Sequence, residues 1–334
     1  MLKILLRLAI AFLIILLFIV LIINLNPYKL LSLIKNSDWS ILSLILLTNF
    51  LAIIFFFLAW HFLLIKLEKI SLYESFKSTC IAIFFNLIIP SFSLSGEYAR
   101  IVYLNRYHDI PNEKLLAILS INKFQYGLAM IIFFVFGLLL MFFSNIKFFA
   151  LLFSLLIVIF LIITLFLLIA FPNILKKVII FILERLAKIN TRINDRYESL
   201  IEKSNKFVDE FSFYGRYLLK SSHSILTLFL MILQWLFNSI SFYLAFIALG
   251  YPQNLGVLIF TFPIISFLTT TAIFVPANVG IVEPIMIAIY SGFGIDPLIS
   301  AAAILLARTI IIVEDLFLSL PFVISMGIKS KLFL

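Results

Sequence analysis

Long uninterrupted runs of apolar residues constrain this chain more than any other feature. A helix needs about 20 apolar residues to cross the hydrocarbon core of a bilayer. Six stretches come near or exceed that length: Leu8 to Ile23, Ser40 to Ile65, Leu115 to Phe143, Phe148 to Phe171, Ser222 to Leu249 and Leu298 to Ile324. No small-residue cleavage site follows the first stretch, so we expect it to be retained rather than removed as a signal peptide. The sequence therefore predicts an all-α, polytopic integral membrane protein with about six full spans.

Composition excludes the main alternatives to a helical membrane protein. Apolar residues make up 64% of the chain and charged residues 12%, whereas a soluble protein carries about 25% charged residues. The mean hydropathy is +1.22. These values exclude a soluble enzyme, a secreted disulfide scaffold and a disordered protein. They also exclude an outer-membrane barrel, because the strands of a barrel alternate apolar and polar residues.

The residue types that carry chemistry are sparse. The single cysteine, Cys80, leaves no intramolecular disulfide and no thiolate metal cluster, and His61, His108 and His223 lack the spacing of metal ligands. The sequence contains no nucleophile–base pair, phosphate loop or dinucleotide fingerprint. We therefore expect no enzyme activity, no catalytic residues, no metal and no cofactor.

Two segments are interrupted in a way that ordinary spans are not. Thr79 to Pro90 is apolar but only about 18 Å long as a helix, and the chain resumes a helical pattern at Glu97 to Tyr107. Gly256 to Val275 is interrupted by Pro263, breaks over 276–280 and resumes at Ile281 to Ser291. Broken helices occur at membrane depth only inside protein or beside a water-filled cavity. We predict two re-entrant helical hairpins, although for the second a full crossing stays open.

Charge arithmetic sets the predicted orientation. Residues 172–220 form an amphipathic stretch with ten basic and six acidic residues, which places them in the cytoplasm. If both hairpins are re-entrant and the N- and C-termini are cytoplasmic, 20 of the 25 basic residues face the cytoplasm. Topology thus explains the net charge of +9 better than nucleic-acid binding does. The 172–220 stretch either lies on the inner leaflet and attracts anionic lipid or forms a plain cytoplasmic hairpin.

An internal repeat relates the two broken segments. Pro90 lies seven residues before Glu97, and Pro276 lies seven before Glu283. A basic residue follows each glutamate, Lys123 after 26 residues and Arg308 after 25. With the charge-derived topology the two hairpins enter from opposite sides, which is the inverted-repeat pattern of transporters. We therefore expect a single transmembrane domain, 1–334, divided into 1–39 (first span and loop), 40–143 (repeat one), 144–221 (span and cytoplasmic segment) and 222–328 (repeat two).

Charged residues inside apolar segments are the candidate functional residues, because a charge at membrane depth is costly. A helix start near Gly280 can bind an anion through its free amides, and a guanidinium suits a phosphate. The substrate-binding candidates are Glu97, Arg100, Lys123, Asn278, Gly280, Glu283 and Arg308, with Glu314 and Asp315 as counter-charges. The structural alternatives are a helix-dipole role for the glutamates and a charge network that locks the helices together.

Two motifs carry a family resemblance. The Pro90, Gly96, Glu97 and Arg100 pattern and the Pro276, Gly280, Glu283, Gly294 and Arg308 pattern resemble two signatures of the lysylphosphatidylglycerol synthase transmembrane (flippase-like domain) family. The resemblance covers roughly Ser40 to Ile324 and implies a stand-alone member without the soluble synthase domain. The chain departs from the family at Asn122-Lys123-Phe124, where a lysine replaces the charge of an arginine.

The resemblance implies a bacterial inner-membrane protein that moves lipid between leaflets. The expected partners are membrane lipids: an anionic or aminoacylated phospholipid, or a lipid-linked precursor. With no ATP-binding motif, transport would be facilitated, coupled to an ion or proton, for example through Glu97 or Glu283, or powered by another protein. The alternative is a non-transporting scaffold for a membrane-associated synthase or glycosyltransferase, with residues 172–220 as its contact surface. No nucleic acid is expected as a partner.

Overall fold

The computed structural model describes residues 20, 23–89, 94–142, 172–187, 197–270 and 275–329. Within these ranges every regular element is a helix: α2 (Pro27–Lys35), α3 (Trp39–Leu67), α4 (Leu72–Ile88), α5 (Leu94–His108), α6 (Asn112–Phe142), α8 (Pro172–Ala187), α10 (Tyr197–Leu219), α11 (Ser222–Ala248), α12 (Leu255–Thr270), the short 3-10 helix η1 (Pro276–Asn278), α13 (Val282–Gly292) and α14 (Pro297–Lys329). The predicted all-α architecture is confirmed. Phe148 to Phe171 and nearly all of Leu8 to Ile23 lie outside the described residues.

Among the described residues, three helices are long and apolar enough to cross a membrane: Trp39–Leu67, Asn112–Leu140 and Ser222–Ala248. They coincide with three of the six predicted spans. The predicted span at Leu298 to Ile324 lies within α14, a helix of 33 residues that is not among these three. The chain is therefore a helical membrane protein.

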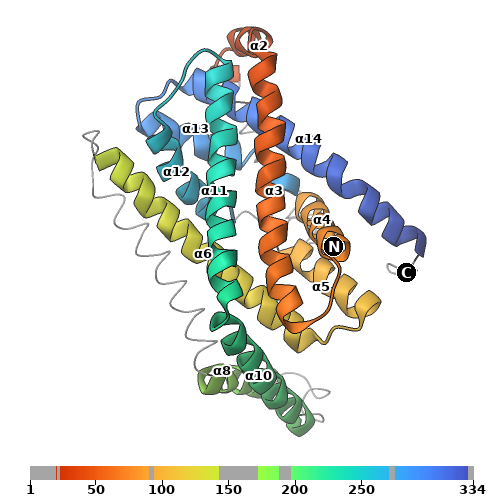
Figure 1. Cartoon of the computed structure of the whole chain (residues 1–334). Helices are drawn as coiled ribbons and strands as arrows, with labels where there is room; N and C mark the ends of the chain where they lie inside the picture. The colour runs from red at the N-terminus through yellow and green to blue at the C-terminus, as the bar shows by residue number, and fades with distance from the viewer. Residues whose placement is uncertain are drawn as a thin grey trace.

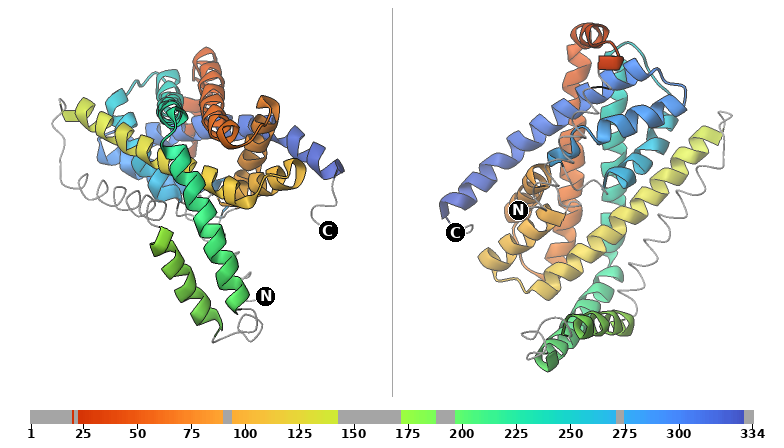
Figure 2. Two further views of the ribbon diagram at one scale, coloured as in Figure 1. Left: turned by 60° about the horizontal axis from the view of Figure 1, so that its bottom comes forward. Right: turned by 180° about the vertical axis from the view of Figure 1, so that it is seen from behind.

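The helices α3 and α11 run side by side through the middle of the molecule (Figure 1). Thr48 and Ser241 join them through a buried hydrogen bond of 2.8 Å between their hydroxyls. At one end, the amide of Asp38 donates to the carbonyl of Ala248 at 2.8 Å. The helices α6 and α14 cross this pair obliquely, as Figure 2 shows from behind. Hydrogen bonds thus join α3 to α11 in addition to side-chain packing, as is common between membrane helices.

Capping residues decide where two of the helices begin. Asp38 caps α3 by accepting from the amides of Ser40 and Ile41, and the hydroxyl and amide of Ser40 hold the pKa of the Asp38 carboxyl below its ordinary value. Ser71 caps α4 by accepting from the amide of Glu74 at 3.2 Å. The first broken helix therefore begins at Leu72, seven residues before the predicted start. Its 17 residues span about 26 Å, still short of the roughly 30 Å hydrocarbon core.

The first hairpin, α4 and α5, closes over a glycine. A side chain at Gly96 would overlap the carbonyl oxygen of Ala82 and approach Asn86 Cγ to 2.6 Å. The amide of Gly96 donates to Asn86 Oδ1 at 2.9 Å, so the close approach is also hydrogen-bonded. The described parts of the segment thus form two packed helices, as predicted, with α5 beginning at Leu94 rather than Glu97.

The second hairpin differs from its prediction in one respect. The helix α12 continues through Pro263 to Thr270 instead of being interrupted there. Proline removes one backbone donor, and membrane helices tolerate this loss where neighbouring groups compensate. Within η1 and just after it the backbone turns sharply, with positive φ at Ala277 (50°) and Asn278 (54°) in η1 and at Gly280 (81°) beyond it. The helix α13 then begins at Val282, close to the predicted restart.

In the described parts of the amphipathic 172–220 stretch, 172–187 and 197–220, the helices α8 and α10 pack together at one end of the bundle (Figure 1). Lys176 Nζ pairs with Asp209 Oδ1 at 2.7 Å and fastens α8 to α10. The α10 helix also packs against α6, and it leads directly into α11. The pair thus lies beside the ends of α6 and α11, where Phe211 and Leu218 of α10 belong to the same buried cluster as the first hairpin.

Candidate functional site

The first charged cluster surrounds Glu97 in the first turn of α5. Its carboxylate is buried, forms an ion pair with Arg100, and lies 2.6 Å from Lys123 Nζ on α6. The guanidinium of Arg100 is fully buried and stacks on Trp60 of α3, 3.6 Å from the ring centroid. The structure therefore brings together three predicted site residues and adds Trp60. No spacing in the sequence relates Trp60 to Arg100, because the two residues meet only through tertiary packing.

The second charged cluster surrounds Glu283 in the first turn of α13. Its Oε1 lies 3.0 Å from Arg308 Nε, and its Oε2 accepts from the amide of Gly280 at 2.6 Å. Arg308 Nη2 also donates to the carbonyl of Ala277 at 2.6 Å. The glutamate and the arginine thus hold the sharp turn between η1 and α13. The amide of Gly280, predicted to face an anion, faces the chain's own carboxylate.

The two clusters have the same construction. Each glutamate lies in the first turn of the helix that follows a break, and each pairs with a cation on a later helix. The pairs are Glu97 with Lys123 and Glu283 with Arg308, which are the positions that the sequence offset matches. The same geometry also fits a structural role, because the glutamates lie at helix starts and the ion pairs with Lys123 and Arg308 join different helices.

A cavity of about 270 Å³ lies beside the second cluster. Its walls come from α4, α11, α12, η1, α13 and α14, and its polar lining residues are Asn238, Ser266, Asn278, Arg308 and Asp315. Glu97, Arg100 and Lys123 are not among the lining residues. Of the predicted substrate-binding cations, Arg308 therefore reaches this cavity, whereas Arg100 is enclosed in the first hairpin.

Of the two predicted counter-charges, Asp315 lines the cavity together with Arg308, and both carboxylates accept hydrogen bonds from Asn49. Asn49 Nδ2 on α3 donates to Glu314 Oε2 at 3.0 Å and to Asp315 Oδ1 at 3.1 Å. Within the described part of the chain neither carboxylate forms an ion pair, and the counter-charge of Arg308 is Glu283. The Arg308 side chain turns toward the break at Ala277, and not along α14 toward Asp315. In the sequence, the only indication of these hydrogen bonds was the presence of a polar residue, Asn49, within an apolar span.

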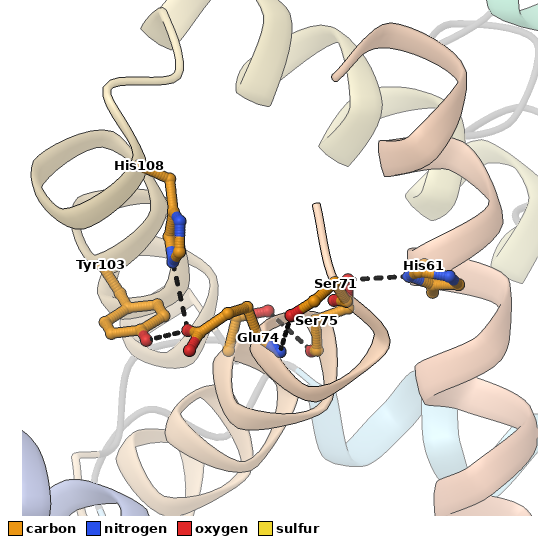
Figure 3. Close-up of polar contacts among 7 residues, drawn as sticks. His61, Ser71, Glu74, Ser75, Tyr103 and His108 are labelled. Carbon is orange, nitrogen blue, oxygen red and sulfur yellow. Dashed lines mark hydrogen bonds and ion pairs between the residues drawn. The ribbon is translucent and has the colours of Figure 1, made fainter. Parts of the chain in front are cut away.

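A further polar cluster joins the two outer ends of the first hairpin (Figure 3). Tyr103 donates to Glu74, and His108 Nε2 lies 3.1 Å from the same carboxylate oxygen. Burial raises the pKa of Glu74, but hydrogen bonds from Tyr103 and His108 outweigh it, so the pKa lies below its ordinary value. His61 Nδ1 pairs with the hydroxyl of Ser75 at 2.8 Å. These contacts fix α4 to α3 and to α5.

Metal ligation has no support among the residues that can be described. No three His, Cys, Asp or Glu side chains there gather closely enough to hold a metal ion. Cys80 is a buried free thiol. The site is thus built from ion pairs and amides, which suits recognition of a charged group by hydrogen bonding.

Fold and site together define a helical membrane protein in which two broken hairpins each hold a buried glutamate–cation pair. The family model for the lysylphosphatidylglycerol synthase transmembrane region matches residues 4–316 of the 334-residue chain, and the chain belongs to this family. Membership of this family supports a lipid-related function for a membrane protein. No curated protein and no solved structure matches the chain.

Proposed function

We propose that this protein moves a lipid with an anionic headgroup between the leaflets of a bacterial inner membrane. The observation that carries the proposal is Arg308, a cation held by the second broken hairpin in the wall of a cavity. A translocated lipid needs a polar path for its headgroup while its acyl chains stay in the bilayer. The candidate lipids are an anionic or aminoacylated phospholipid and a lipid-linked precursor.

The geometry around Arg308 supports binding of a phosphate. Its Nε and Nη2 are engaged by Glu283 and Ala277, and Nη1 has no partner among the residues placed in the structure. A guanidinium fixed in this way offers its remaining donors in a defined direction. Asn278 and Asn238 line the same cavity and supply amide donors. Its volume of about 270 Å³ is at the lower limit of pockets for drug-sized ligands, which suits a headgroup without its chains.

The proposed topology has six spans, cytoplasmic N- and C-termini and two hairpins that re-enter from opposite faces as an inverted repeat. The distribution of basic residues supports the orientation. The matching pairs Glu97–Lys123 and Glu283–Arg308 support the repeat. The proposed role is transport without a chemical step, facilitated or driven by a coupled ion or proton, with membrane lipids as partners.

The test measures lipid translocation by the purified protein reconstituted into vesicles that contain fluorescently labelled phospholipids. A membrane-impermeant reductant added outside destroys the label of every lipid that reaches the outer leaflet, so translocation appears as loss of fluorescence. Arg308→Ala should slow translocation about 10- to 100-fold, because a hydrogen bond to a charged group contributes about 1.5–3 kcal/mol. Arg308→Lys should retain part of the activity. Arg106→Ala, a matched control at an exposed position on α5, should leave it unchanged.

Unchanged translocation by Arg308→Ala would refute the assigned role of this residue. Absence of translocation by the unaltered protein, with every lipid class named above, would favour the scaffold alternative. In that case deletion of 172–220 should abolish the activity of a partner synthase or glycosyltransferase, whereas Arg308→Ala should not. Native mass spectrometry of co-purifying lipids supplies the first substrate to try, since one enriched anionic or aminoacylated lipid should be lost in Arg308→Ala.

A further inference from the structure

The helix α8 exposes a stripe of large apolar side chains. Val178, Phe181, Ile182 and Leu186 are between 43% and 57% exposed. Their spacing of three and four residues places them on one side of the helix. The guanidinium of Arg185 lies 5.3 Å from the ring centroid of Phe181, so the positive charge of Arg185 lies at the edge of the apolar stripe. In a cytoplasmic segment an exposed apolar stripe of this kind marks an interaction surface.

The opposite side of α8 is already occupied by α10. Lys176 pairs with Asp209, and Ile179 lines a hollow together with Leu200 and Phe207 of α10. These contacts hold the two helices together and turn the stripe away from α10. Whatever covers the stripe must therefore lie outside the α8–α10 pair.

Charge is distributed unequally between the two helices. Residues 172–196, which include α8 and the segment after it, carry six basic and two acidic residues, whereas α10 carries three basic and four acidic residues. Lys177 and Arg185 are exposed beside the stripe, with Glu184 as the one acidic residue of α8. An apolar stripe with flanking basic side chains is the pattern of a helix that lies in the surface of an anionic membrane.

Chain connectivity places α8 at the membrane surface. The predicted fourth span ends at Phe171, and α8 begins at the next residue, Pro172. At the other end of the pair, α10 ends at Leu219 and α11, a spanning helix, begins at Ser222. Figure 2 (right) shows α8 lying across the direction of α11 rather than along it. A helix that starts at the interface and runs across the spans is placed to lie in the membrane plane.

We propose that α8 docks its apolar stripe on the cytoplasmic leaflet as an in-plane helix, and that Lys177 and Arg185 make this docking selective for anionic phospholipid. The side chains of both residues are long enough to reach the phosphates while Phe181 and Ile182 insert among the acyl chains. This docking is independent of lipid translocation. It would bring anionic lipid to the cytoplasmic end of α6 and α11.

The test places an environment-sensitive fluorophore on single cysteines in a Cys80→Ala background, in the full chain reconstituted into vesicles. Val178→Cys reports on the stripe, and Glu202→Cys, exposed on α10, is the matched control. Vesicles contain phosphatidylcholine alone or mixed with phosphatidylglycerol, each with or without a spin-labelled lipid as quencher. Circular dichroism and gel filtration check that each variant is folded.

In anionic vesicles the Val178 probe should be blue-shifted and quenched by the spin-labelled lipid, whereas the Glu202 probe should stay in water. Lys177→Gln and Arg185→Gln should each lower the ratio of docked to undocked protein about fivefold, with a similar effect of high salt. A Val178 probe that stays in water in both kinds of vesicle would overturn the proposal. A blue-shifted probe that lipid does not quench would also overturn it, because protein would then cover the stripe. Equal quenching in both kinds of vesicle would refute the selectivity for anionic lipid.

Discussion

Arg100 and Lys123 both pair with Glu97, yet their removal should have very different effects on stability. Arg100 is fully buried, whereas the side chain of Lys123 is 39% exposed. Removal of one partner from a buried ion pair costs about 3–5 kcal/mol. The Lys123 side chain is not enclosed by protein, and its removal leaves Glu97 paired with Arg100, so its loss should cost no more than that of an exposed ion pair, at most about 1 kcal/mol. We therefore expect Arg100→Ala to lower the free energy of unfolding by about 3–5 kcal/mol, and Lys123→Ala by less than about 1 kcal/mol.

The contacts of the two side chains explain the difference. Arg100→Ala removes the charge beside Glu97 and the guanidinium that stacks on Trp60, and it leaves a cavity between α3 and α5. Stacking of a desolvated guanidinium on tryptophan is worth about 2 kcal/mol, so the loss combines an electrostatic and a packing part. Lys123→Ala leaves Glu97 paired with Arg100. Arg100→Lys, which keeps the charge without the planar stack, should fall between the two.

Unfolding in mixed micelles of mild detergent and dodecyl sulfate, followed by far-UV circular dichroism, measures these differences. The unaltered protein and the three variants are compared at the same protein and detergent concentrations. If Lys123→Ala proves as destabilising as Arg100→Ala, burial does not determine the strength of this cluster. If Arg100→Lys matches the unaltered protein, the stack on Trp60 contributes nothing.

Other consequences follow from single contacts. Gly96→Ala should destabilise the first hairpin by about 1–3 kcal/mol, because its methyl group would overlap the Ala82 carbonyl. The control is Gly292→Ala, which has open space around it and should stay within about 0.5 kcal/mol of the unaltered protein. Thermal unfolding of the two variants measures the difference. The lowered pKa of Glu74 means that this carboxylate stabilises the fold at neutral pH and that the stabilisation is lost as the pH falls through the acid range. Tyr103→Phe should reduce that acid sensitivity, as the pH dependence of the unfolding midpoint would show.

Hydropathy and charge were sufficient to predict the elements that the bilayer itself dictates. Three of the predicted spans are long apolar helices in the structure, and lipid allows such apolar runs few structures besides a helix. The breaks near Gly96 and Gly280 were also predictable, because proline and glycine mark them in the sequence. The ion pair of Glu97 with Lys123 and that of Glu283 with Arg308 match the residues of the predicted repeat.

Contacts between distant residues could not be predicted from the same patterns. The start of α4 depends on a serine cap at Ser71 in a segment that is not apolar. The passage of α12 through Pro263 depends on its surroundings, which override the proline. The side-chain amide of Asn49 donates a hydrogen bond to the carboxylate of Asp315, a residue 266 positions further along the chain. Such contacts leave no periodic signal, because they are set by how the helices pack.

The two hairpins share one construction but differ in what surrounds it. In the first hairpin, Arg100 follows Glu97 by three residues, and its guanidinium packs on Trp60. In the second hairpin, Met286 occupies the equivalent position three residues after Glu283, and it lines the cavity. Glu97 thus has two cations and an enclosed site, whereas Glu283 has one cation whose side chain borders open space. Substitutions should separate accordingly: changes at Arg100 should act on stability alone, whereas changes at Arg308, which leave the buried Glu283 without its cation, should lower lipid translocation by more than their effect on stability explains. If both act mainly on stability, the second hairpin is a structural support like the first, and the headgroup path lies elsewhere in the bundle.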